Sequence, residues 1–472
     1  MGIGNLDLSL GEKMTFIAKN FNKYKVMSFI FVFTVIFGNY AIVDIHILGV
    51  VPTYYRVMIP VLFIFVILKE RKFLKEELIQ ENFKIVKFFY AIVLFWILYG
   101  AVSLFLSPWS AFNIGAREIL ALVLAAMSVY VVSFLVKKEC FYDIITVIKI
   151  AVIVLLIIGF VETITGKHLG ASMWNDSDYI DRLQEIYKGD MIPKEARYIA
   201  TGIFYNPNDY CAFLSVFSPV FLFHKSEDTK TIVGNYTVLF FVFTIFIIDD
   251  AWICIVALLL GIIVYFLAVK ASVGKYLSIA GVFICARYGG GYLIEGVSAC
   301  LYRIFKYDIF NHMVRVSEVE TAVITQVDNM VQDQGSLFFR INTYLESISE
   351  MFIQSKGLGL GAGSFASYFG GIAEQKNMMS NPHSFWVEIL VQYGVVIFML
   401  FVAILVVIFG KLIMKIIKED SKIYAVIIAM GTAFIFASFA PSSYLTNPYY
   451  WLPIGLALGL LVNGNGISSR SL

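Results

Sequence analysis

The sequence predicts an all-α fold: a polytopic membrane helical bundle of about 12 transmembrane helices, with a long external loop that contains short helices. The first observation is composition, because 59% of the 472 residues are hydrophobic, 15% are charged and the mean hydropathy is +0.80. Soluble domains contain roughly 45 to 50% apolar residues. The second is that apolar runs of about 20 residues, the length that crosses a bilayer, recur almost from end to end. We therefore expect a single integral-membrane domain over residues 1–472.

The lysine and arginine residues between the apolar runs give the orientation. They precede the first run and crowd the connections at about 69–88 and 411–422, whereas the short connections near 107–114 and 249–250 contain none. Basic residues favour the cytoplasmic side of a membrane, so both chain ends are expected in the cytoplasm. The predicted spans are, in order, 26–48, 50–68, 89–106, 115–136, 144–165, 209–224, 232–248, 251–269, 276–295, 384–410, 423–440 and 444–463.

Two connections are long, 166–208 and 296–383, and the alternation of sides makes both of them external loops. Loops of this length are usually functional or disordered. In the second loop Arg340, Tyr344 and Ser347 share one helical face, beside an apolar stripe of Leu337, Ile341, Leu345, Ile348 and Phe352. We expect an amphipathic helix on the membrane surface.

Glycine recurs at every second position from Gly357 to Gly363, directly after this expected helix. Two interpretations remain open: a helix cap with a hinge, or a nest of backbone N–H groups that binds an anion. The spacing over 357–362 also matches G-x-G-x-x-A, but no buried strand precedes it, so a dinucleotide site is rejected.

Three residues are candidates for catalysis: His383, Arg340 and Arg197. His383 lies where the long loop meets the next span, and its ordinary pKa suits a general base, although an incidental histidine at an interface is the alternative. Arg340 could stabilise an anion or extend to lipid phosphates. Arg197 could do the same, or form an ordinary surface ion pair with Glu195 or Asp209.

The candidates for substrate binding lie close to these residues in the sequence. Asn206, Asn208 and Asp209 follow Arg197, and the Asn206-Pro207 step also predicts a turn and the N-cap of a helix. Glu388 lies just inside the span after His383, and Tyr344 shares the face of Arg340. Charged residues within predicted spans are costly in lipid and must face a cavity, a partner or the interface; besides Glu388 these are Arg117, Lys149 and Glu162.

Two stretches together resemble the O-antigen ligase and Wzy-type polymerase family. One runs from Arg197 through Gly202 and Asn206-Pro207-Asn208-Asp209 to Tyr210. The other runs from Arg340 through the glycine-rich turn to His383-Ser384, with Glu388 and Gly394 downstream. The resemblance implies a GT-C-like membrane glycosyltransferase that polymerises polyprenyl-diphosphate-linked oligosaccharide repeat units of a bacterial surface polysaccharide, of O-antigen, capsule or teichuronic-acid type.

The sequence departs from this family at one place. Family members commonly carry Ser-Arg-Gly or Ser-Arg-Ala at the outer end of the span before the eighth, where this chain has Asp249-Asp250. The arginine credited with holding the donor diphosphate is therefore missing. Arg197, Arg303 or Arg315 could replace it; otherwise the protein is impaired or uses another donor.

The expected reaction places an acceptor hydroxyl opposite a leaving lipid diphosphate, on the external face of the cytoplasmic membrane. Arg340 and Arg197 would stabilise the leaving group without a divalent metal, and His383 would take the hydroxyl proton. No cofactor, metal or nucleic acid is expected, since the histidines lack a metal-ligand spacing. The expected partners are the lipid-linked saccharide donor, a glycan acceptor, the lipid bilayer, a flippase and a chain-length regulator. A ligase that transfers finished glycan is the alternative, and a flippase or transporter is the more distant one.

Overall fold

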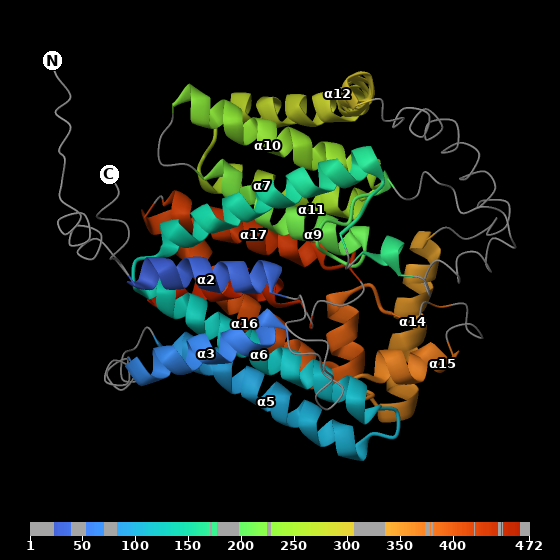
Figure 1. Cartoon of the computed structure of the whole chain (residues 1–472). Coiled ribbons are helices and arrows are strands. Elements are labelled where there is room, and N and C mark those ends of the chain that lie inside the picture. Colours follow the sequence, from blue (N-terminus) through green and yellow to red (C-terminus); the bar gives the residue numbers. More distant parts are fainter. Residues whose placement is uncertain are drawn as a thin grey trace, which may run out of the picture.

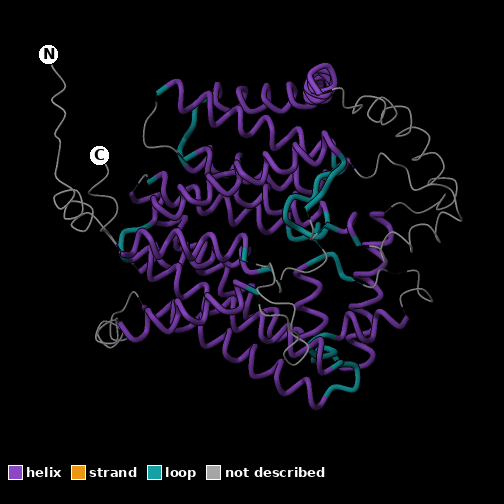
Figure 2. The backbone as a smooth tube through the Cα atoms, in the orientation of Figure 1, coloured by secondary structure: helices purple, strands orange, loops and turns teal. Residues whose placement is uncertain are grey.

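The computed structural model describes residues 23–38, 53–69, 83–169, 172–176, 198–223, 228–305, 336–372, 378, 381–419, 421–441, 445 and 447–462. Within these ranges every element of regular structure is a helix, and Figures 1 and 2 show most helices lying side by side along one direction. The first half of the bundle consists of α2 (Lys23–Phe37), α3 (Tyr54–Lys69), α5 (Lys84–Leu106), α6 (Phe112–Lys137), α7 (Phe141–Thr165) and the short η2 (Met173–Asn175). The second half consists of α9 (Pro207–Phe217), η4 (Ser218–Leu222), α10 (Thr229–Ile248), α11 (Trp252–Ala268), α12 (Val273–Phe305), α14 (Ser336–Ser355), η5 (Phe365–Phe369), α15 (Gly370–Ile372), α16 (Phe385–Glu419), α17 (Lys422–Ala437), η6 (Pro448–Trp451) and α18 (Leu452–Val462).

The predicted fold class is confirmed, because each predicted span contains a helix and the chain is a polytopic helical membrane protein. Six helices in the described ranges are long and apolar enough to cross a bilayer, and three shorter apolar helices accompany them. Some boundaries differ from the prediction. The span expected at 384–410 is interrupted at Gly394, whose backbone is not helical (φ 81°, ψ 173°), and then continues to Glu419.

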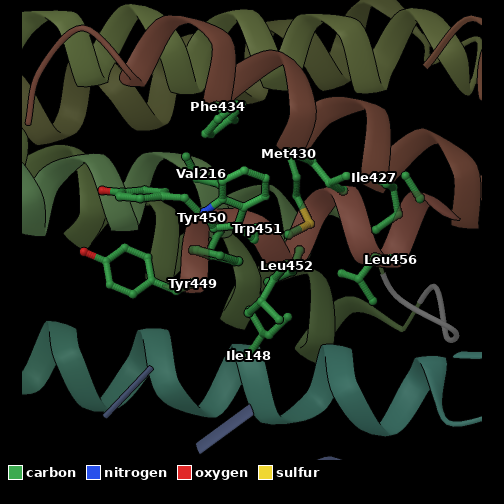
Figure 3. Close-up of a cluster of buried hydrophobic side chains, with 14 of the residues drawn as sticks. Ile148, Val216, Ile427, Met430, Phe434, Tyr449, Tyr450, Trp451, Leu452 and Leu456 are labelled. Carbon is green, nitrogen blue, oxygen red and sulfur yellow. The ribbon is translucent and has the colours of Figure 1, made fainter. Parts of the chain in front are cut away.

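Close packing of the long helices depends on small residues at their contacts. The most extensive pairs are α11 with α17 and α6 with α18. A Cβ added at Gly261 of α11 would lie 2.8 Å from the carbonyl oxygen of Ala429 on α17. Glycine lets helix backbones approach where burial in lipid provides little driving force. The buried cluster in Figure 3 fills the space around α17, where Tyr449, Tyr450 and Trp451 lie below Phe434.

One charged residue within a predicted span has a structural partner. Lys149, on α7, donates from Nζ to the carbonyl oxygen of Phe223 at 2.7 Å. That carbonyl directly follows η4, so the lysine caps the end of the short α9–η4 helix. Arg117 on α6 is exposed and lies within electrostatic range of Arg56 on α3. Lys149 therefore meets the expectation that a charge within a predicted span has a partner, but the partner is a backbone carbonyl and not an acidic side chain.

Helix α14 runs across one end of the bundle and not along it (Figure 1). We call this end, with α14, the turn at 357–364 and His383, the α14 end. The expected amphipathic helix is present, but its polar face is turned inward: Thr343 and Ser347 are fully buried, whereas Ile341 and Leu345 are 46% and 65% exposed. The helix therefore presents apolar side chains outward and polar side chains to α16.

Candidate functional site

The carboxyl end of α17 brings Arg340 and His383 together. Three successive carbonyl oxygens there accept hydrogen bonds: Ser438 from the Phe385 N–H at 3.0 Å, Phe439 from Arg340 Nη1 at 2.9 Å, and Ala440 from His383 Nδ1 at 3.4 Å. α17 ends at Ala437, so these carbonyls belong to the segment that directly follows the helix. They therefore orient a cation and an imidazole side by side, although the two residues lie 43 positions apart in the sequence.

His383 has the geometry of a neutral base. Because a carbonyl can only accept, the contact with Ala440 places the proton on Nδ1 and leaves the lone pair on Nε2. Burial and the neighbouring Arg340 guanidinium lower the pKa of His383 to about 4, so the imidazole is uncharged at neutral pH. Its backbone adopts a left-handed conformation with φ 45°, which is uncommon for a residue with a side chain.

Arg340 is held at one end of its guanidinium group. Nη1 binds the Phe439 carbonyl, while Nε is buried and has no hydrogen-bond partner among the described residues. A buried guanidinium donor without a partner costs free energy unless a ligand supplies an acceptor. Arg340 therefore has donor capacity for an anion at the same place where His383 has a free lone pair.

Tyr344 lies one turn after Arg340 and contacts the histidine segment. Its hydroxyl donates to the carbonyl oxygen of His383 at 3.1 Å, and it also hydrogen-bonds the side chain of Ser384. Burial raises the pKa of Tyr344 above its ordinary value, so the hydroxyl stays protonated and can donate. The structure thus gives Tyr344 a role in positioning His383, whereas its predicted contact with substrate stays a prediction.

The start of α9 forms a second part of the site. Asn206 accepts the Asp209 N–H at 2.9 Å and Pro207 occupies the first turn, so the predicted N-cap is confirmed. Asp209 Oδ1 is buried and has no hydrogen-bond partner among the described residues. Asn208 is half-buried beside it. Asp209 and Arg340 both lie within electrostatic range of the Cys254 thiol on α11, so the two parts of the site are near one residue.

Asp249, the first residue of the Asp249-Asp250 departure from the family motif, has a structural role here. Its Oδ1 accepts the Ala200 N–H at 3.0 Å, and its Oδ2 accepts from Cys211 Sγ at 3.4 Å. Burial raises the pKa of this carboxyl well above its ordinary value. It therefore anchors the segment before α9. Arg197, three residues before Ala200, lies outside the described residues, as do Arg315 and the side chain of Arg303.

Glu162 holds the same segment from the other side. The carboxylate is 1% exposed and accepts the backbone N–H groups of Thr201 at 2.8 Å and Gly202 at 2.6 Å. His168 Nδ1 lies 3.6 Å from Glu162 Oε2 and 3.2 Å from the Thr201 hydroxyl. The sequence indicated that Glu162 needs a partner, but it gave no sign that the partner is backbone more than 35 residues away.

The glycine-rich turn is occupied by protein contacts. From residue 358 through 364 each backbone N–H has an acceptor within the chain; the acceptors include the Val391 and Gln392 carbonyls, the Ser103 hydroxyl and the Glu118 carboxylate. A Cβ at Gly359 would lie 2.5 Å from the backbone nitrogen of Gly394, so the turn fits against the break in α16. The structure therefore supports a helix cap and contradicts the anion-binding nest.

Glu388 lies one turn after Ser384, whose carbonyl accepts its N–H at 2.9 Å. The side chain is 3% exposed and lies within electrostatic range of Tyr393, the residue before the break in α16. Its predicted part in substrate binding stays a prediction. Among the described residues, no three His, Cys, Asp or Glu side chains gather as metal ligands would.

Comparison with known proteins gives one distant relative. The chain matches no family model. It is similar to the teichuronic acid biosynthesis protein TuaE of Bacillus subtilis (strain 168), with 24% identity over 382 residues, which cover 77% of this chain and 69% of that protein.

Proposed function

We propose that this protein is a membrane glycosyltransferase of surface polysaccharide biosynthesis, and that it joins saccharide units carried on a polyprenyl diphosphate. The observation that carries the proposal is the pairing of Arg340 and His383 on successive carbonyls at the end of α17. A cation with spare donor capacity and a neutral imidazole are the two groups that such a transfer needs. The similarity to a protein named for teichuronic acid biosynthesis supports the same class of process.

In the proposed reaction an acceptor hydroxyl attacks the anomeric carbon of the donor sugar. The new bond forms from the hydroxyl oxygen, its proton passes to Nε2 of His383, and the bond from the anomeric carbon to the diphosphate breaks. The lipid diphosphate leaves with the bonding electron pair. Arg340 stabilises the developing charge through a charge-assisted hydrogen bond, and Asp209 orients the acceptor through its unpartnered carboxylate oxygen.

The proposal also places the α14 end on the external side of the membrane. Lysines gather at the opposite end, where Lys25 lies 3.6 Å from Asp143 and Lys138 lies over the ring of Tyr24. Cysteine labelling of intact cells, in a variant without native cysteines, should modify Ser336→Cys and not Lys418→Cys. Labelling of the second variant alone would place the reaction in the cytoplasm and overturn this orientation.

Surface glycan from a deletion strain tests the function and separates its two forms. Loss of a polymerase leaves single lipid-linked repeat units, whereas loss of a ligase leaves long chains attached to the lipid carrier. Wild-type glycan of normal length and attachment would contradict both forms. The purified protein, given a polyprenyl-diphosphate-linked repeat unit, should release the lipid diphosphate as the saccharide is transferred.

A further inference from the structure

An apolar groove runs between α16 and α17. It forms an open cavity of about 470 Å³. The α16 residues that line the groove recur at helical spacing from Phe398 to Ile413. The α17 residues that line it lie between Ile428 and Ile435. At 1.5 Å per residue the α16 wall is about 22 Å long, most of the roughly 30 Å thickness of the bilayer's hydrocarbon core.

A glycine shapes the middle of this groove. Gly431 on α17 lies against the ring of Phe409, and a Cβ there would lie 2.4 Å from the ring carbon Cε1. Any side chain at position 431 would therefore push Phe409 outward into the groove. The hollow between the two helices depends on this close approach of ring and backbone.

The groove begins at the proposed reaction site. Trp386 lines its end, three residues after His383, and donates from Nε1 to the Ile435 carbonyl at 3.1 Å. Ile435 lies three residues before Ser438, the first of the three carbonyls that hold the histidine segment and Arg340. Neither Arg340 nor His383 lines the groove itself, but the end that Trp386 lines is close to both of them in the chain and in its contacts.

We propose that the groove between α16 and α17 holds the polyprenyl chain of the donor while Arg340 binds its diphosphate. This inference rests on the proposed function and names where the donor lipid lies. The complementarity has two parts: an apolar channel for the chain and, for the anion, a buried guanidinium held on Phe439, one helical turn beyond the Ile435 carbonyl that Trp386 binds. A chain held there fixes the direction from which the anomeric carbon approaches His383.

Binding of the prenyl chain in the groove should orient the donor more than it increases the affinity for it. A prenyl chain moving from bilayer lipid into the groove leaves one apolar medium for another, so burial adds little free energy. Alignment of the reacting atoms can by contrast change a rate by orders of magnitude. Filling the groove should accordingly slow turnover with long-chain donors and have little effect on short-chain donors, which do not reach into it.

The test compares two identical substitutions on α16 in reconstituted protein. Val402→Trp fills the groove, whereas Val396→Trp adds the same side chain at a site that is 57% exposed and outside the groove. With a long-chain polyprenyl donor, Val402→Trp should reduce kcat about tenfold relative to Val396→Trp. With a short, soluble prenyl diphosphate donor the two variants should have equal rates.

The remaining outcomes distinguish failure of the groove proposal from failure of the proposed function. Equal loss with both donors would mean that the tryptophan disturbs the reaction site, and no loss with either would mean that the groove holds bilayer lipid; both overturn the groove proposal. Transfer by the wild-type protein from neither donor would instead refute the proposed function. If Val402→Trp does not fold, a long-chain donor with a photoreactive group on its lipid can be crosslinked to the wild-type protein. Crosslinks within 398–413 or 428–435 are expected, and crosslinks confined to other helices would exclude the groove.

Discussion

Two regions at the α14 end contain buried polar groups, and they differ in how those groups are satisfied. Around the glycine-rich turn, every backbone N–H from 358 to 364 has an acceptor, and Glu118 accepts from Gly363 N–H at 2.9 Å and from the Tyr393 hydroxyl at 3.4 Å. Around α17, Arg340 Nε and Asp209 Oδ1 are buried without hydrogen-bond partners among the residues described. Neutral side chains without hydrogen-bond partners in the described part of the chain occur in the first region too, at Ser110, Ser364 and Gln392. The difference is one of charge, because a buried charged group without a partner costs more free energy than a neutral one. We therefore expect the first region to be structural and substrate to bind at the second.

The largest effect should come from the cation. Arg340→Ala should reduce transfer by about 10²- to 10³-fold, because no remaining group there offsets the charge on the leaving diphosphate. Arg340→Lys should recover little, since a point charge does not reproduce the planar fork of donors. Turnover of purified variants, matched for membrane level, measures both. Near-normal turnover of the alanine variant would reduce Arg340 to an anchor for α14.

The next effect separates binding from chemistry. His383→Ala should still bind the lipid-linked donor, while its turnover falls about 100-fold or more, the usual contribution of a general base. Donor binding and single-turnover rates measured on the same preparation test this separation. Equal losses in both would instead indicate that the histidine shapes the donor site.

A matched pair of neutral, isosteric substitutions tests the contrast between the two regions directly. Glu118→Gln should lower the free energy of unfolding by about 1 to 3 kcal/mol, because it weakens the acceptor for Gly363 and Tyr393. Asp209→Asn should leave stability unchanged or raise it, since an unpartnered carboxylate is removed, but should lower transfer. Thermal unfolding and kcat/KM of both variants are the measurements. A loss of stability in Asp209→Asn, with a loss of transfer alone in Glu118→Gln, would refute the contrast between the two regions.

The smallest effect concerns pH. The pKa of His383 is lowered to about 4 by burial and Arg340, below the ordinary value of roughly 6.5. The acid limb of kcat/KM should therefore lie near pH 4. Because the unfolded chain binds a proton that the folded chain excludes, stability should fall as pH drops from about 6.5 to 4. His383→Gln should remove this slope, and an acid limb near 6.5 would mean that the imidazole is exposed to water.

Apolar runs of about 20 residues were enough to predict a helix in each of the expected spans, because a bilayer requires long apolar helices. The orientation inferred from the basic residues stays a prediction. The sequence indicated one site for Arg340 and His383 through their shared loop and the family resemblance, but not that their side chains lie next to each other. The carbonyls of 438–440 could not be predicted, since backbone acceptors leave no mark in the side-chain pattern. The role of Glu162 is hidden in a similar way, because the N–H groups that donate to its carboxylate lie on a distant backbone segment. In the sequence Asp249 was only part of a departure from the family motif, whereas its hydrogen bond with the Ala200 N–H shows what the residue does in this chain.

The apolar side chains that α14 presents outward connect the candidate site to its surroundings. Leu345 and Ile353 are 65% and 68% exposed on the helix that carries Arg340, and the inward face contacts α16 and the segment after α17. If α14 lies on the membrane surface, as its sequence predicts, these side chains contact acyl chains. We therefore expect turnover to depend on the lipid around α14 and to differ between a bilayer and a detergent micelle.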